Sequence, residues 1–192
     1  MVDSSKGKIE SIVGCMFAGK TEELLRRIRR AEIAEKNIQA FTQSEDTRYG
    51  DACIGSHSGE KYEATLVDDS EDIIENINDE VEVVAIDEAN FFSEDLISVV
   101  QQLAEDGVRV IVCGLDQNFR GEPFHPVPEL MAVSDEIEKL KAVCLSCSEM
   151  ATRTQRLDGD GNPAKEEEKE ILVSGGGRFY EPRCRDCHQL RE

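Results

Sequence analysis

The residues from Gly14 to Thr21 carry the clearest chemical pattern in the sequence, because they read Gly-x-x-x-x-Gly-Lys-Thr. Glycines let the backbone curl so that successive N–H groups face an anion, and a following helix adds the favourable end of its dipole. In such a loop the lysine reaches the β- and γ-phosphates, and the hydroxyl residue reaches magnesium. The pattern therefore predicts that Lys20 and Thr21 bind a nucleoside triphosphate with its metal. A glycine turn beside a surface lysine is the competing interpretation.

A pair of carboxylates, Asp87 and Glu88, follows the apolar run 81–86. Such a run is typical of a parallel strand that is buried on both faces. Where phosphate is transferred, one carboxylate at a strand end holds magnesium and another polarises the attacking group. We predict these two roles for the pair, although helix-capping charge ahead of residues 91–95 would also account for it.

Four of the seven cysteines form two Cys-x-x-Cys pairs, Cys144 with Cys147 and Cys184 with Cys187. The chain begins without the apolar core of a signal peptide, so the spacing indicates a metal site more than disulfides. Four thiolates are the ligand set of a tetrahedral structural zinc. His188, directly after the last cysteine, is a second choice of ligand.

Apolar periodicity supplies the elements that must position these groups. Strand patterns alternate with helical ones, which predicts an α/β domain with a largely parallel sheet, and ligands gather at the carboxyl ends of its strands. We expect strands over 9–13, 38–42, 81–86 and 108–114, helices from 22 to about 36, from 70 to about 78 and over 94–105, and a long loop over 43–59.

Length and charge limit the classes of function. The 192 residues suit one substantial domain with a small appendage, and no apolar run approaches the ~20 residues of a membrane span. A formal net charge of −19 argues against binding nucleic acid or acidic membranes. The default expectation is a cytoplasmic protein, and we hypothesise that the acidity reflects a salt-rich cytoplasm.

Two glycine-marked segments suggest a further pocket. The 114–124 segment follows a strand pattern and contains two phenylalanines and an arginine. The 171–180 segment is an apolar strand pattern with three glycines and then Tyr180. Glycine lets the main chain approach a ligand closely, and the tyrosine could close the pocket. A flexible linker is the alternative for the second segment.

Taken together, these motifs resemble the type II thymidine kinases, the cytosolic class that phosphorylates thymidine with ATP. The resemblance extends over nearly the whole chain. It rests on the following segments: Gly14 to Thr21, Asp46-Thr47-Arg48-Tyr49, Ser56-His57-x-Gly59, Ile86-Asp87-Glu88-Ala89-x-Phe91-Phe92, Gly114-Leu115-Asp116 with Phe119-Arg120-x-x-Pro123-Phe124, and the two cysteine pairs around the glycines and Tyr180.

The resemblance implies a P-loop NTPase-type domain over residues 1–142, with a largely parallel sheet flanked by helices. A small zinc-clamped lasso over residues 143–192 would close over the nucleoside as a lid. It also implies a homotetramer that takes ATP and thymidine, with Mg²⁺ accompanying ATP and Zn²⁺ held by the four cysteines.

The resemblance further assigns roles to individual residues. Glu88 would be the general base that takes the proton of the thymidine 5′-hydroxyl. The ATP and magnesium site would comprise Gly14, Cys15, Met16, Phe17, Ala18, Gly19, Lys20, Thr21, Asp46, Thr47, Arg48, Asp87 and Asn90. The thymidine site would comprise Met16, Leu115, Phe119, Phe124, Thr154 and Tyr180, with Ile171, Leu172, Val173, Ser174 and Gly175 binding the base mainly through backbone groups.

Three residues depart from the pattern of the family. Asn90 stands where glutamine is usual, and Cys15 and Ala18 replace a usual proline and serine. None of these changes removes a catalytic group. Use of deoxyuridine and inhibition by dTTP stay open. The alternatives are a P-loop ATPase in which Glu88 activates water, and a zinc ribbon that binds protein or nucleic acid.

Overall fold

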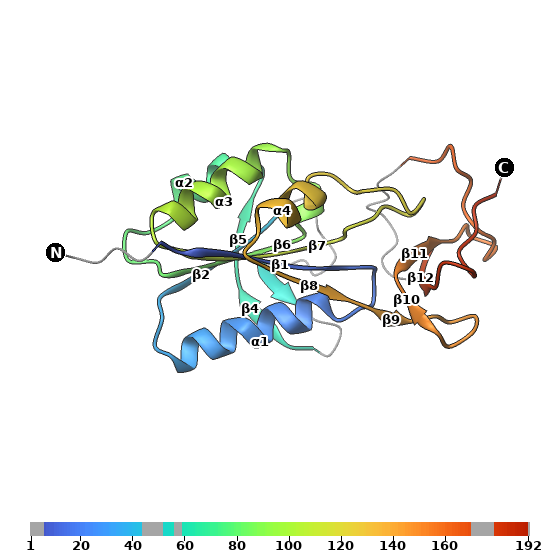
Figure 1. Cartoon of the computed structure of the whole chain (residues 1–192), viewed down its shortest axis with the longest axis horizontal. Coiled ribbons are helices and arrows are strands. Elements are labelled where there is room, and N and C mark those ends of the chain that lie inside the picture. The colour runs from blue at the N-terminus through green and yellow to red at the C-terminus, as the bar shows by residue number, and fades with distance from the viewer. Residues whose placement is uncertain (1–5, 44–51, 56–58, 170–178, 192) are drawn as a thin grey trace.

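A six-stranded sheet forms the centre of the computed structural model, which describes residues 6–43, 52–55, 59–169 and 179–191 (Figure 1). The strand order is β5-β2-β6-β7-β1-β8, and every neighbouring pair is parallel. The predicted α/β class with a parallel sheet is thereby confirmed. The strands are β1 (Lys8–Gly14), β2 (Ile38–Gln43), β5 (Thr65–Val67), β6 (Val83–Asp87), β7 (Arg109–Gly114) and β8 (Glu136–Leu140).

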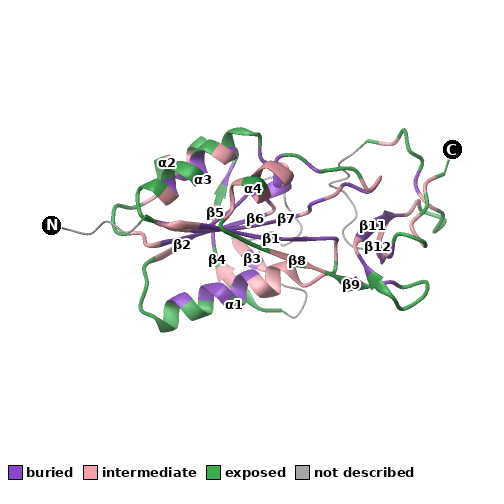
Figure 2. Cartoon of the chain, in the orientation of Figure 1, coloured by how far each residue is buried: buried purple, intermediate pink, exposed green. Residues whose placement is uncertain are grey.

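Helices cover both faces of this sheet. The helix α1 (Lys20–Ile33) packs on one face, and α2 (Glu71–Asn76), α3 (Asp95–Glu105) and α4 (Val127–Val133) pack on the other (Figure 1). Apolar residues recur at helical spacing in α1, so one stripe is buried while its arginines mostly face outward. The central strands are buried from both sides (Figure 2), which explains the continuous apolar runs.

A small hairpin begins within the stretch 43–59, for which we expected a loop. Strand β3 (Cys53–Gly55) pairs antiparallel with β4 (Lys61–Glu63). Ile54 is buried in the same apolar cluster as the inner face of α1, and Tyr62 packs against that cluster. The hairpin is ordered by burial against a distant helix, which local polarity does not reveal.

The C-terminal unit, as we call the described residues 142–169 and 179–191, lies beyond the carboxyl edge of the sheet (Figure 1). It contains two antiparallel pairs of strands. Strand β9 (Ala142–Val143) pairs with β10 (Met150–Ala151), and β11 (Arg153–Arg156) pairs with β12 (Tyr180–Arg183). These short strands bring both Cys-x-x-Cys turns to one place.

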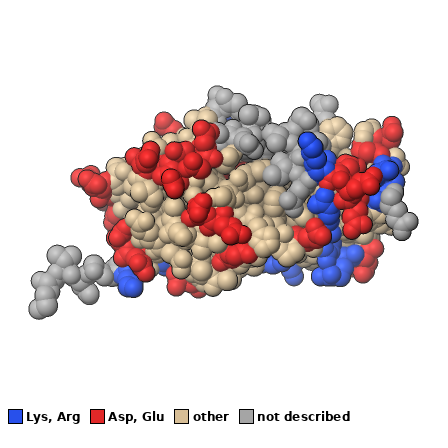
Figure 3. All heavy atoms as spheres, turned by 90° about the horizontal axis from the view of Figure 1, so that it is seen from above, with Lys and Arg blue, Asp and Glu red and all other residues tan. Residues whose placement is uncertain are grey.

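Charge is unevenly distributed over the surface. On the face shown in Figure 3, Asp and Glu dominate the part over α2 and α3, whereas Lys and Arg are interspersed with Asp and Glu over the C-terminal part. Among the described residues, no helix combines the length and the apolar composition needed to span a bilayer.

Candidate active site

The phosphate loop, residues 14–21, connects the end of β1 to the start of α1. Gly14 and Gly19 have φ angles of +147° and +84°, in the left-handed region that favours glycine. A Cβ atom at Gly14 would lie 2.5 Å from the carbonyl oxygen of Leu140, so only glycine fits there. Phe17 also has a positive φ, 64°, although it is a bulky residue. Strain of this kind is common where a backbone is shaped for a ligand.

Lys20 and Thr21 are the first two residues of α1, which begins two residues before the predicted start at residue 22. The Nζ atom of Lys20 donates to the carbonyl oxygen of Cys15 at 3.1 Å, within the phosphate loop itself. The hydroxyl of Thr21 donates to Oδ2 of Asp87 at 3.4 Å. The structure therefore brings the end of β6 to the first turn of α1. Two hard oxygen ligands lie side by side there, which is a donor set that suits magnesium.

Glu88 follows directly on β6 and is half-buried. Its backbone is left-handed, with φ 54° and ψ 40°, and its N–H donates to Oδ1 of Asp87 at 2.9 Å. This turn starts the short 3-10 helix η2 (Ala89–Phe91). Nearby, burial raises the pKa of the Cys113 thiol well above its usual range, and the carboxylate of Asp87 raises it further. Cys113 is thus a buried, uncharged thiol that packs near Asp87.

Asn90 is buried, with 3% of its surface exposed. Its Oδ1 accepts a hydrogen bond of 2.8 Å from the backbone N–H of Leu115. Its Nδ2 is enclosed without a hydrogen-bond partner in the described part of the chain. Asn90 therefore joins the segment of Glu88 to the segment predicted to line the nucleoside pocket.

The structure brings Thr154, one of the residues predicted for thymidine, next to the phosphate loop. The backbone N–H of Met16 donates to Oγ1 of Thr154 on β11 at 3.0 Å. Tyr180 begins β12 and pairs with Arg156 of β11. Phe124 is buried and closes the 115–124 loop, where its N–H donates to the carbonyl oxygen of Asp116.

Phe119 is held by the C-terminal unit. The guanidinium carbons of Arg120 and Arg156 lie 4.4 and 4.9 Å from the centroid of its ring, within the range of cation–π attraction. Its carbonyl oxygen is 2.8 Å from Nε2 of His188. Burial lowers the pKa of His188, which favours a neutral ring that donates to this carbonyl. His188 thus contacts Phe119, and it is not part of the metal-ligand group found among the described residues.

Two predicted stretches lie outside the described residues. They are Asp46, Thr47 and Arg48, predicted near the phosphates, and Ile171, Leu172, Val173, Ser174 and Gly175, predicted to contact the base. The structure adds nothing to those predictions.

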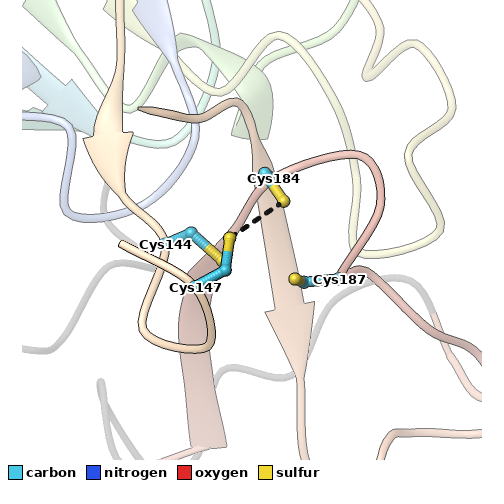
Figure 4. Close-up of side chains that lie close together, drawn as sticks. All are labelled: Cys144, Cys147, Cys184 and Cys187. Carbon is cyan, nitrogen blue, oxygen red and sulfur yellow. Dashed lines mark hydrogen bonds between the residues drawn. The ribbon is translucent and has the colours of Figure 1, made fainter. Parts of the chain in front are cut away.

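Four cysteines converge in the C-terminal unit (Figure 4). One ligand atom from each of Cys144, Cys147, Cys184 and Cys187 lies within 4.8 Å of all the others. The Sγ atoms of Cys147 and Cys184 are 3.6 Å apart. A tetrahedral zinc with bonds of about 2.3 Å separates its sulfur ligands by about 3.8 Å. The donor set and spacing fit such an ion, and all four cysteines are free of disulfides.

An ion pair that the motifs did not indicate flanks the phosphate loop. Asp116, after β7, is buried, and its Oδ2 lies 2.5 Å from Nζ of Lys139 on β8. Because β7 and β8 are the two neighbours of β1, the pair spans the strand that ends at Gly14. Arg153 also ties β11 to the 115–124 loop, since it donates to Oε1 of Gln117 at 3.1 Å. Residue spacing gives no signal for contacts between segments so far apart in sequence.

The fold and the site define a P-loop-type α/β protein with a C-terminal four-cysteine cluster. A family model described as thymidine kinase matches residues 7–188. The chain belongs to the thymidine kinase family and is an ATP-dependent nucleoside kinase.

Two relatives named thymidine kinase agree with this assignment. The chain is 50% identical to a thymidine kinase of Halobacterium salinarum, with 98% of this chain and 97% of the relative covered. It is 46% identical, with the same coverage of both chains, to a thymidine kinase of Haloquadratum walsbyi. Among solved structures, domain III of the Thermotoga maritima replication initiation protein DnaA matches with a TM-score of 0.42 and 14% identity, over 72% of this chain and 56% of that one.

Proposed function

We propose that the protein transfers the γ-phosphoryl group of ATP to the 5′-hydroxyl of thymidine, with Glu88 as the general base. The product would be dTMP, a precursor for DNA synthesis obtained by salvage. The observation that carries the proposal is the meeting of β6 and α1, where Thr21 contacts Asp87 and Glu88 follows directly. This arrangement places an acidic pair beside a phosphate loop.

Asp87 and Glu88 would have different roles in the reaction. Asp87 already accepts hydrogen bonds from Thr21 and from the N–H of Glu88, so it is oriented toward the start of α1. Magnesium, when bound with ATP through Thr21 and Asp87, would neutralise charge on the phosphates. Glu88 would accept the proton of the nucleoside hydroxyl.

Lys20 would change partners when the triphosphate binds. Its ammonium group donates to the carbonyl oxygen of Cys15, which is one of the loop's own backbone groups. A phosphate oxygen is a charged acceptor and forms a stronger hydrogen bond than a neutral carbonyl. We therefore expect Lys20 to leave Cys15 and to bind the β- and γ-phosphates.

The nucleoside would lie between the phosphate loop and the C-terminal unit. Support comes from the hydrogen bond between the N–H of Met16 and Thr154, and from the contact of Phe119 with His188. Residues 1–142 would then bind ATP, and residues 143–192, held by zinc, would close over thymidine. Closure matters because phosphoryl transfer in the presence of water would hydrolyse ATP without product.

Thymidine-dependent formation of ADP by Glu88→Gln tests the proposal. We expect turnover to fall about a hundredfold or more, since a positioned base contributes about 10²–10⁴ in rate. Binding of an ATP analogue should persist. Glu94→Gln is the matched control, because Glu94 is an exposed carboxylate just ahead of α3. Retained turnover in Glu88→Gln would show that another group takes the proton.

The same assay addresses an ATPase that uses water as acceptor. ADP formation that does not depend on a nucleoside would favour that function, and a comparison of deoxyuridine with thymidine would define the acceptor. Free cysteines suit a reducing compartment, which supports a cytoplasmic location. A homotetramer and inhibition by dTTP rest on the family resemblance alone.

A further inference from the structure

The phosphate loop packs directly against the four-cysteine cluster. Cys15 is 2% exposed and belongs to an apolar cluster with Cys144 and Cys184, in which Ala142 and Ala151 also take part. Ala18 of the loop and Cys187 pack against the same cluster. The loop thus touches the part of the chain that carries the metal ligands.

Two hydrogen bonds reinforce this packing. The thiol of Cys15 donates to the carbonyl oxygen of Ala151 at 3.5 Å, and the N–H of Met16 donates to Oγ1 of Thr154 at 3.0 Å. The side chain of Thr154 is enclosed, because only 3% of the residue is exposed.

Both acceptors lie on strands that lead to the cysteines. Ala151 ends β10, which pairs with β9, and Cys144 follows β9 directly. Thr154 is on β11, which pairs with β12, and Cys184 follows β12 directly. A change in the separation of the two Cys-x-x-Cys turns would therefore move Ala151 and Thr154 relative to the loop.

A phosphate loop binds its ligand through several N–H groups that must point in one direction. The N–H of Met16 is already directed toward Thr154, so the C-terminal unit sets the orientation of the peptide at this position. Displacement of such a group by about 1 Å can cost a hundredfold in a positioned site. The orientation of the loop therefore depends on a residue that lies beyond the sheet.

We propose that Thr154 and the four-cysteine cluster position the phosphate loop, so that metal occupancy controls the affinity for the nucleoside triphosphate. Thr154 is a positioning residue in this inference, which rests on the proposed ATP site at residues 14–21. The C-terminal unit then supports the triphosphate site as well as the nucleoside site. A lid that acted on the nucleoside alone would need neither of the two hydrogen bonds.

The first experiment measures the binding of a fluorescent, non-hydrolysable ATP analogue without thymidine. The full-length protein is titrated as the zinc-loaded form, after chelation, and after zinc is added back, with zinc content measured at each step. We expect the dissociation constant to rise about tenfold on chelation and to recover with zinc, as loss of a buried hydrogen bond would cause. Unchanged affinity in the zinc-free protein, with its circular dichroism spectrum retained, would overturn the proposal.

Substitutions test the link without removing the metal. Thr154→Val keeps the shape of the side chain but removes the acceptor of the Met16 N–H, so we expect about a tenfold weaker affinity for the analogue at full zinc content. Thr154→Ser keeps the hydroxyl and should restore the affinity. Thr152→Val is the matched control, since Thr152 precedes β11 on the same segment and is half-buried. Native affinity in Thr154→Val would refute the positioning role.

Failure of the positioning inference can be distinguished from failure of the proposed phosphotransfer. If the phosphotransfer proposal is wrong, the native protein produces no thymidine-dependent ADP, yet its affinity for the analogue can still respond to zinc. If the positioning inference is wrong, thymidine-dependent ADP formation is intact while the affinity for the analogue ignores both zinc and Thr154.

Discussion

At the amino end of β1, the carboxylate of Glu10 is 1% exposed and pairs with Lys8, Arg27 and Arg109 at 2.6 to 2.9 Å. At the carboxyl end of the same strand, Gly14 starts a loop whose backbone is left-handed at three positions. The amino end satisfies its charges with neighbouring side chains. At the carboxyl end, the backbone of the phosphate loop is held in a strained conformation that side-chain packing does not require.

The difference separates stability from chemistry. Burial by itself would raise the pKa of Glu10, but hydrogen bonds from Arg109, Lys8 and Arg27 outweigh it and lower the pKa to about 2. The cleft of about 770 Å³ at this end is lined by these cations and also by carboxylates such as Glu82 and Glu136, which balance them. We interpret the amino end as a structural ion network. The carboxyl end is where ligands are expected in a parallel sheet.

Glu10→Gln should have the largest effect on stability. A pKa of about 2, below the ordinary 4.5, corresponds to about 3 kcal/mol of unfolding free energy at neutral pH. This contribution is present above pH 4.5 and fades as the pH falls toward 2, because the unfolded chain takes up a proton that the folded state binds only near pH 2. Denaturant titrations of native and variant protein from neutral to acidic pH should show the two curves converging.

The same variant sharpens the comparison with the active site. Affinity for the ATP analogue should be unaffected in Glu10→Gln at neutral pH, whereas Glu88→Gln should lose turnover and keep its stability. A buried network is also poorly screened, so the loss of stability should persist in concentrated KCl. A catalytic defect in folded Glu10→Gln would contradict the division between the two ends.

Gly14→Ala should have an intermediate effect, directed at the other end of the strand. The new Cβ would meet the carbonyl oxygen of Leu140 at 2.5 Å in a backbone that L-residues avoid. We expect a loss of about 1–3 kcal/mol in unfolding free energy together with weaker binding of the analogue. Gly159→Ala is the control, since a Cβ there meets nothing within 4 Å. Calorimetric titration and denaturation of both variants would check this, and equal behaviour would argue against a shaped loop.

Lys36→Gln should have the smallest effect. Nζ of Lys36 lies 2.7 Å from Oε1 of Glu82 at the amino end, but the two side chains are 48% and 42% exposed. Exposed ion pairs contribute little because water and salt screen them. The denaturation midpoint should match the native one within error. A clear drop would mean that the outer pairs belong to the same network as Glu10.

Local patterns predicted much of this molecule. The phosphate-loop spacing, the Asp87-Glu88 strand end and the two cysteine pairs each depend on residues within a few positions of one another. The apolar runs of the central strands and the stripe of α1 likewise reflect burial that repeats with the period of the element. Strand β3 was missed because Ile54 is one apolar residue in a polar stretch, and its burial depends on a distant helix.

The sequence by itself determined the class of chemistry, since only certain residue types at fixed spacing can hold a triphosphate or a tetrahedral metal. The tertiary structure decided how those sites are connected. It placed Met16 against Thr154, His188 against Phe119, and Asp116 against Lys139. Such contacts join residues far apart along the chain, and their types are too common to indicate a partner. Their pairing follows from the strand order, which sets β7 and β8 beside β1 and the C-terminal unit beyond its end.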